Sequence, residues 1–166
     1  MSSKDQIRGH ERTRRDRQID DYVHDPYHSR YKPREPAVCP TCGVVFEHGR
    51  WHWKSRPADA NEHTCPACQR IHDRMPAGYV TLSGPFFNEH REQIMQLVHH
   101  QEERAKAEHP MERIMEVRTE GEATIVHTTD VHLAKRLGDA MHHAYQGELE
   151  TKYAPDEYLV RVFWSR

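Results

Sequence analysis

Long hydrophobic runs are missing from this sequence. Apolar stretches such as residues 44–46 are very short, and the mean hydropathy is −1.00. A membrane-spanning helix needs about 20 consecutive, mostly apolar residues, so the sequence predicts no membrane span and no membrane partner. No apolar stretch follows the first charged residues either. We therefore expect no secretory signal and a cytoplasmic location.

Cysteine is also scarce, and its few residues are paired. The chain has four cysteines, arranged as Cys39 with Cys42 and Cys65 with Cys68, and 22 residues separate the pairs. Two residues between ligands let a tight turn direct both sulfurs at one ion, and Gly43 can take the positive φ of such a turn. Four thiolates form a closed tetrahedral shell. The sequence therefore predicts a structural Zn²⁺ ion bound by all four cysteines.

Other chemistries are open to two C-x-x-C pairs. An iron centre of rubredoxin type is the main alternative, since four thiolates also bind iron. The missing secretory signal argues against two disulfides. We expect neither pair to begin a helix after a strand, as a thioredoxin-like redox site would. Histidines could replace a cysteine, but four matched cysteines suffice; the nearby candidates are His48, His52, His63 and His72.

Composition and charge divide the chain into three parts. Residues 1–36 form a polar basic arm that we expect to be extended or disordered, and Tyr27 is one of several tyrosines spaced along it. Residues 37–78 have too few aliphatic side chains to fold by hydrophobic burial alone, and they fit a zinc ribbon. Residues 79–166 carry 10 Lys/Arg against 15 Asp/Glu, whereas the preceding 78 residues carry 14 against 11. Any polyanion should therefore meet the N-terminal half.

The third part has the pattern of an α+β domain. Its apolar spacing predicts the order β-α-β-β-α-β, which is the ferredoxin-like topology with four antiparallel strands covered on one face by two helices. Gly84-Pro85 begins the first helix, Thr129 or Asp130 caps the second, and Gly147 ends it. The predicted elements are a strand at 79–83, a helix from 85 to about 108, strands at 112–119 and 122–128 joined by a turn at 120–121, a helix at about 130–146 and a strand at 158–164.

One segment between the cysteine pairs suits nucleic-acid binding. Residues 48–56, the basic aromatic segment, contain three permanent cations, two indoles and two imidazoles. Cations neutralise phosphates and flat rings accept unstacked bases. In the alternative interpretation, the tryptophans cover the metal module and the arm is a solvated tail. The candidate nucleic-acid contacts are Arg8, Arg12, Arg14, Arg15, Arg17, Arg50, Trp51, Trp53, Lys54 and Arg56.

The sheet of the third part lacks the expected rings. RNA-recognition modules stack bases on aromatics of their first and third strands, but the third predicted strand, residues 123–128, contains none. The net charge of −5 also opposes phosphate. We therefore expect this domain to bind a protein or to position the arm and ribbon. No convincing nucleophile beside a base, phosphate loop or H-E-x-x-H helix is present, so we expect no enzyme and no small-molecule substrate.

Several motifs together carry a resemblance. They are Cys39-Pro-Thr-Cys-Gly43 and Cys65-Pro-Ala-Cys68, then Asp130-Val-His-Leu-Ala-Lys-Arg-Leu-Gly138 and Ala144-Tyr-Gln-Gly-Glu-Leu149. Over about residues 37–166 the chain resembles small bacterial zinc-ribbon proteins of unassigned function. These are similar to the N-terminal part of the nonsense-mediated-decay protein three family, the large ribosomal subunit export adaptors. That family has further cysteine pairs in its zinc region, whereas this chain has four cysteines in all.

The resemblance implies a structural zinc ion, binding to the large ribosomal subunit and no catalytic residue. A bacterium has no nuclear export, so only ribosome association transfers. We therefore expect a factor that binds the ribosome or rRNA, acting in subunit maturation or in protecting idle ribosomes under stress (hibernation). The alternative is a zinc-stabilised adaptor or regulator that binds a protein through the C-terminal domain and does not contact nucleic acid.

Overall fold

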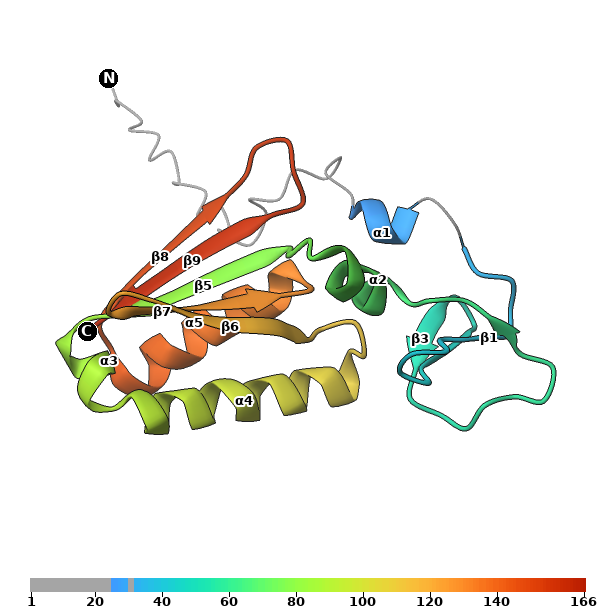
Figure 1. Ribbon diagram of the computed structural model, residues 1–166, viewed down its shortest axis with the longest axis horizontal. Helices are drawn as coiled ribbons and strands as arrows, with labels where there is room; N and C mark the ends of the chain where they lie inside the picture. Colours follow the sequence, from blue (N-terminus) through green and yellow to red (C-terminus); the bar gives the residue numbers. More distant parts are fainter. Residues whose placement is uncertain (1–24, 30–31) are drawn as a thin grey trace, which may run out of the picture.

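A computed structural model describes residues 25–29 and 32–166 of the chain. These residues form a small module around the four cysteines (37–73), called the metal module after the ion predicted there, and a larger C-terminal domain (77–166) (Figure 1). The predicted contacts at Arg8, Arg12, Arg14, Arg15 and Arg17 lie outside the described residues. The elements are α1 (Pro26–Ser29), β1 (Ala37–Val38), β2 (Val45–Glu47), β3 (Arg50–His52), β4 (Asn61–Glu62), α2 (Pro66–Asp73), β5 (Gly78–Ser83), α3 (Pro85–Glu89), α4 (Arg91–Glu108), β6 (Ile114–Glu120), β7 (Ala123–Thr128), α5 (Val131–Tyr145), β8 (Glu148–Tyr153) and β9 (Val160–Ser165).

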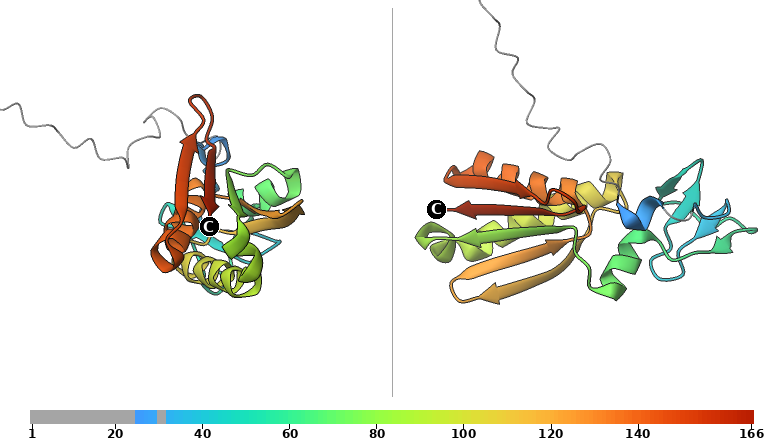
Figure 2. Two further views of the ribbon diagram at one scale, coloured as in Figure 1. Left: turned by 90° about the vertical axis from the view of Figure 1, so that its left-hand side faces the viewer. Right: turned by 90° about the horizontal axis from the view of Figure 1, so that it is seen from above.

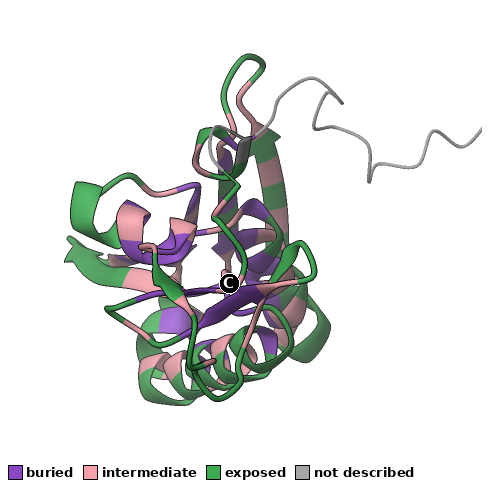
Figure 3. Ribbon diagram, turned by 90° about the vertical axis from the view of Figure 1, so that its right-hand side faces the viewer, coloured by how far each residue is buried: buried purple, intermediate pink, exposed green. Residues whose placement is uncertain are grey.

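The metal module is a short sheet followed by one helix. Its strands lie in the order β3-β2-β1-β4. The first two pairings are antiparallel, whereas β1 and β4 are parallel. Helix α2 follows β4 directly. Seen from this end of the molecule, buried residues are concentrated on the inner strands and the loops are exposed (Figure 3).

The C-terminal domain packs three helices on one face of a five-stranded sheet. In the right-hand view of Figure 2 the strands lie in front of α4 and α5. Alternate residues of β5, β7 and β9 face the helices, because side chains of a strand point to opposite faces in turn. The buried core consists of Ala77, Val80, Leu82, Phe87, Ile94, Val98, Ala105, Val126, Val131, Leu133, Ala134, Leu137, Met141, Val160, Val162 and Trp164. The α+β class is confirmed.

The prediction of a sheet with four antiparallel strands is wrong: the structure adds an edge strand, and one pair of strands is parallel. The strand order is β6-β7-β5-β9-β8, so the sheet has five strands. After α5 the chain returns along the edge as β8 and then turns back, so that β9 runs parallel to its neighbour β5. The segment of β8 reads ELETKY. Its charged residues alternate with Leu149, Thr151 and Tyr153, which is typical of an exposed edge strand, and the sequence prediction missed this signal.

Two further local predictions need correction. The predicted single helix is interrupted at His90, whose φ of −116° and ψ of 21° separate α3 from α4. The hairpin turn lies at residues 121–122, because Glu120 pairs with Ala123. Of the two predicted caps of α5, Thr129 and Asp130, the structure has Asp130: its carboxylate accepts hydrogen bonds from the backbone N–H groups of His132 (2.7 Å) and Leu133 (3.1 Å).

The end of the predicted arm is folded against the metal module. The prediction of an extended or disordered arm is wrong for residues 25–29, which include α1. The reason is a buried ion pair: an Asp25 carboxylate oxygen lies 2.7 Å from a guanidinium nitrogen of Arg70 on α2. The ring of Tyr27 lies 4.3 Å from the same guanidinium, and its hydroxyl donates to Asp73 (2.9 Å).

No described helix is both long and apolar enough to cross a membrane.

Candidate metal centre

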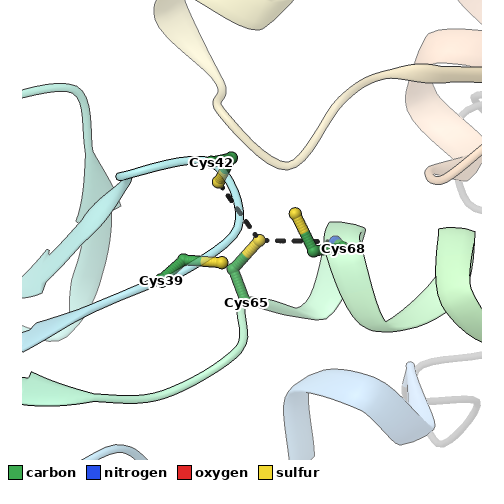
Figure 4. Close-up of side chains that lie close together, drawn as sticks. All are labelled: Cys39, Cys42, Cys65 and Cys68. Carbon is green, nitrogen blue, oxygen red and sulfur yellow. Dashed lines mark hydrogen bonds between the residues drawn. The ribbon is translucent and has the colours of Figure 1, made fainter.

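The first cysteine pair lies in a tight turn after β1. The Gly43 N–H donates to the Cys39 carbonyl (2.9 Å), and the Cys39 N–H donates to the Val44 carbonyl (2.9 Å). Gly43 has a φ of +81°, as predicted for this turn. The turn therefore holds both sulfurs on the side that faces the second pair (Figure 4).

The second cysteine pair begins helix α2. Cys65 is the N-cap, Pro66 is the first helical residue, and the Cys68 N–H donates to the Cys65 sulfur (3.4 Å). The expectation that neither pair begins a helix after a strand is wrong, because α2 follows β4. The proline was the available signal, since proline is favoured at the first helical position. The module is therefore a turn and a helix facing each other rather than a ribbon with two equivalent turns.

The four cysteines form one cluster. Their sulfur atoms all lie within 4.8 Å of one another, and those of Cys42 and Cys65 are 3.8 Å apart. A tetrahedral metal with bonds of about 2.3 Å to sulfur requires sulfur separations of about 3.8 Å. The cysteines are free thiols, and Cys39, Cys65 and Cys68 are buried. The cluster is therefore a four-thiol site that fits a metal ion such as zinc.

A buried arginine of the C-terminal domain contacts this cluster. Arg113, in the loop between α4 and β6, is 6% exposed. Its guanidinium donates to the sulfurs of Cys42 (3.2 Å) and Cys68 (3.3 Å), and more weakly to that of Cys65 (3.7 Å). Its Nε donates to the Pro110 carbonyl (2.8 Å). No sequence motif marks this residue, which lies 45 or more positions from the cysteines, so sequence reasoning missed it.

The arginine has a clear electrostatic role. Four thiolates around a divalent ion carry a net charge of −2, and one guanidinium offsets half of it. Without metal, the hydrogen bond from the Cys65 thiol is the main influence that lowers the pKa of Cys42, to about 4. The Arg113 guanidinium lowers it further, while burial opposes both. The pKa of Cys65 is raised, because Cys65 keeps the shared proton and is buried. The cluster is thus prepared to hold negative charge.

The two tryptophans of the basic aromatic segment have different contacts. Trp51 packs against Phe46, with ring centroids 5.1 Å apart, and lies against the cysteine cluster. Trp53 instead reaches the C-terminal domain: its Nε1 donates to the Lys106 carbonyl (2.8 Å), and its ring lies 5.4 Å from the Arg113 guanidinium. Trp51 therefore covers the metal module, and Trp53 links the module to the domain.

The cations of this segment also differ. Lys54 pairs with Glu47, and Arg56 lies 3.9 Å from Glu62. Arg50 is exposed and has no ion pair within the described part of the chain. Of the three predicted cationic contacts, Arg50 is therefore the one available to an external phosphate.

Arg50 opens onto a cleft between the module and the C-terminal domain. This junction cleft has a volume of about 630 Å³. Two of its carboxylates already have partners: Asp130 caps α5, and Glu112 lies 3.5 Å from the Arg136 guanidinium. The cleft is lined by His28, Phe46, Gly49, Arg50, Trp51, His52, Glu108, His109, Pro110, Met111, Glu112, Asp130, His132 and Arg136.

Comparisons with protein-family models, curated proteins and solved structures gave no match for this chain. Fold and site together define a mixed α+β protein with a four-cysteine cluster.

Proposed function

We propose that this protein is a non-catalytic, zinc-stabilised factor that binds RNA, on the ribosome or on rRNA. The observation that carries the proposal is the junction cleft, which is lined by Arg50, Arg136, four histidines and Trp51. Cations with an aromatic face are the combination by which zinc modules hold RNA. The resemblance to ribosome-binding zinc proteins adds the ribosome as the RNA partner.

The proposal assigns zinc a structural role. A tetrahedral shell of four thiolates leaves no open position for water or substrate, and it suits zinc better than harder cations. In this site Cys39, Cys42, Cys65 and Cys68 would hold the ion, and Arg113 would stabilise the bound thiolates. Elemental analysis of the purified protein tests the metal. One zinc per chain and no visible absorbance support the proposal, whereas a coloured iron–thiolate centre contradicts it.

Sedimentation tests the RNA partner. Lysates of growing and stationary cells are separated on sucrose gradients at two salt concentrations, and the protein is followed across free, subunit, monosome and disome fractions. We expect co-migration that weakens with salt, because released counterions make phosphate binding salt-dependent. Absence from every ribosomal fraction at low salt, in both growth phases, contradicts the proposal.

Paired variants identify the contacts. Replacing Arg50 and Arg136 by Ala should reduce co-migration and flatten its salt dependence. Replacing Lys54 and Arg56 is the matched control, because it removes the same charge from two side chains that do not line the junction cleft. Equal effects of both double variants would contradict a specific role of the junction cleft.

A protein-binding adaptor is the second candidate, favoured by exposed apolar side chains at the C-terminal end of α2. Ile71 is 41% exposed and Met75 is 56% exposed. Exposed apolar side chains that gather on one surface are typical of protein contacts. If the adaptor function holds, the protein remains at the top of the gradient, and Ile71→Ser with Met75→Ser removes it from its partner complex.

A further inference from the structure

One face of the five-stranded sheet is left open by the described helices. α4 and α5 lie behind the strands in the right-hand view of Figure 2, and the near face is uncovered. On β5, β7 and β9 the residues of this face alternate with buried ones. It is therefore a flat surface built on the most regular part of the molecule.

Two aromatic rings lie near the centre of this face. Tyr79 of β5 is paired with His127 of β7 on one side and with Arg161 of β9 on the other. Phe163 pairs with Thr81, two residues further along β5. One strand spacing and two residues of rise place the Tyr79 and Phe163 backbones about 8 Å apart. Rings at this separation can each accept one of two neighbouring unstacked bases.

The sequence prediction considered only part of this surface. The third predicted strand indeed has no aromatic ring, and His127 is its nearest equivalent, in edge contact with Tyr79 at 4.8 Å. The second ring comes from β9, which lies beside β5 in the sheet. Phe163 is 37% exposed, one of the few large apolar side chains at the surface.

Two hollows meet at Tyr79 and form what we call the sheet groove. Their volumes are about 700 and 480 Å³, and both are lined by Arg74, Pro76 and Tyr79. The larger also includes Arg161, and the smaller includes Arg118. None of the residues that line the sheet groove also lines the junction cleft. The groove is therefore a separate site.

Positive charge remains available in the sheet groove despite the acidic domain. Arg161 lies over the Tyr79 ring at 5.3 Å and, within the described residues, pairs with no carboxylate. Arg74 is exposed and likewise has no ion pair there. Glu116, by contrast, is occupied by Arg118 at 2.8 Å. The remaining carboxylates of the groove, Asp156 and Glu157, lie in the larger hollow only.

The second ring has its own cation. Lys152 of β8 lies 5.6 Å from the Phe163 ring and 3.6 Å from Glu150. Cations beside aromatic faces bind the phosphates that flank a stacked base, and they add cation–π attraction. The face thus combines two stacking rings with nearby cations.

We propose that the open sheet face is a second RNA site, which binds a single-stranded segment by stacking bases on Tyr79 and Phe163. Arg74 and Arg161 bind its phosphates. The proposal rests on the proposed function in one respect, that the natural ligand is RNA. Single strands are selected because the bases of a duplex are already stacked and paired.

The test is binding of a fluorescein-labelled, eight-nucleotide oligouridylate to the intact metal-loaded protein, followed by fluorescence anisotropy. Tyr79→Leu and Phe163→Leu should each weaken binding about tenfold, the loss typical of one stacked base. Tyr79→Phe keeps the ring and should bind as the unchanged protein does. Ile125→Ala is the matched control, because Ile125 lies on the same face and pairs with Thr81 but offers no ring. Circular dichroism confirms that each variant is folded.

The charged residues and a duplex provide independent measurements. Arg161→Ala should lower the slope of log affinity against log salt by about 0.7, the value for one phosphate contact with a single strand. The corresponding duplex should bind at least about tenfold more weakly than the single strand. A duplex that binds equally well, or Tyr79→Leu and Phe163→Leu variants that bind normally, would overturn the proposal.

The outcomes separate this inference from the proposed function. If the oligouridylate binds and only Arg50→Ala with Arg136→Ala weakens it, the sheet face is not a site and the junction cleft stands. If the oligouridylate does not bind at all but the protein still follows ribosomes, the sheet proposal fails and the proposed function survives. If the protein is absent from the ribosomal fractions but binds the oligouridylate through Tyr79 and Phe163, the sheet site is supported and the ribosome is not the partner.

Discussion

The metal module and the C-terminal domain are held together by different forces. The buried cluster of the module has five residues among those described, and three of them are cysteines. The cluster of the domain has sixteen, all apolar. A core of the first kind cannot offset the conformational entropy of its chain by hydrophobic burial, whereas the second can. The comparison predicts that the module depends on a bound metal ion for its stability and that the domain does not.

The largest expected effect is selective unfolding of the module without metal. Binding of structural zinc contributes on the order of 10 kcal/mol in small zinc modules. Removal of the metal by a chelator, or Cys65→Ser, should therefore expose the backbone of residues 37–73 and leave β5 to β9 protected. Hydrogen exchange followed by mass spectrometry measures both regions at once. If residues 37–73 stay protected without metal, the module does not need a metal ion to remain folded.

A cavity in the core of the C-terminal domain should destabilise the domain and leave the metal module intact. Trp164 is fully buried, and its indole N–H donates to the Gln146 carbonyl (2.7 Å). Trp164→Ala should lower the free energy of unfolding of the domain by about 3–5 kcal/mol, because it opens a large cavity. Trp164→Phe is the milder control. Thermal unfolding gives the stability, and elemental analysis should still find the metal; loss of metal from the folded variant would mean that the module depends on the core of the domain.

Removing the contact between Arg113 and the cysteines should have an intermediate effect. Arg113→Met removes the hydrogen bonds to the sulfurs of Cys42 and Cys68 and keeps most of the side-chain volume. We expect metal affinity to fall by about 10–100-fold, the usual result of removing a group that supports metal ligands. Competition with a chromophoric chelator measures the affinity. Arg118→Met is the control, since Arg118 is exposed and its ion pair is with Glu116. An equal loss of metal affinity in both variants would show that Arg113 does not stabilise the metal site.

The features that could be predicted from the sequence are those encoded by neighbouring residues. The paired cysteines with Gly43, the cap at Asp130 and the apolar stripe of α5 each lie within a few residues, so local geometry determines them. The parts that sequence reasoning missed depend on distant partners. Arg113 reaches sulfurs far away in the chain, and β9 runs parallel to β5, a strand about 80 residues earlier.

The candidate contact residues illustrate the same limit. Arg50, Lys54 and Arg56 are equivalent cations in the sequence, but Lys54 and Arg56 have carboxylate partners in the fold. Trp51 and Trp53 are two residues apart, yet β3 ends at His52 and Trp53 turns to the C-terminal domain. Tertiary contacts determine which polar side chains find a hydrogen-bond or ion-pair partner within the chain. A local sequence pattern does not contain that information.

The smallest expected effect is a pH dependence at the junction of the two regions. Burial raises the pKa of Glu112 above its ordinary value, and the charge of Asp130 adds to the shift. The folded protein therefore holds this proton to a higher pH than the unfolded chain does. The contribution of Glu112 to stability should be fully present below the ordinary Glu pKa and should be lost as the pH rises through the interval up to the raised value.

Glu112→Gln removes this dependence and should stabilise the protein slightly at neutral pH, with no gain under acid conditions. Glu116 provides a control of opposite sign, because its hydrogen bond from Arg118 lowers its pKa. Its contribution to stability is present above the ordinary Glu pKa and is lost as the pH falls, so Glu116→Gln should weaken the protein at neutral pH. Urea unfolding at acid and neutral pH measures both. Two variants with the same pH dependence would show that burial at the junction does not set the charge of Glu112.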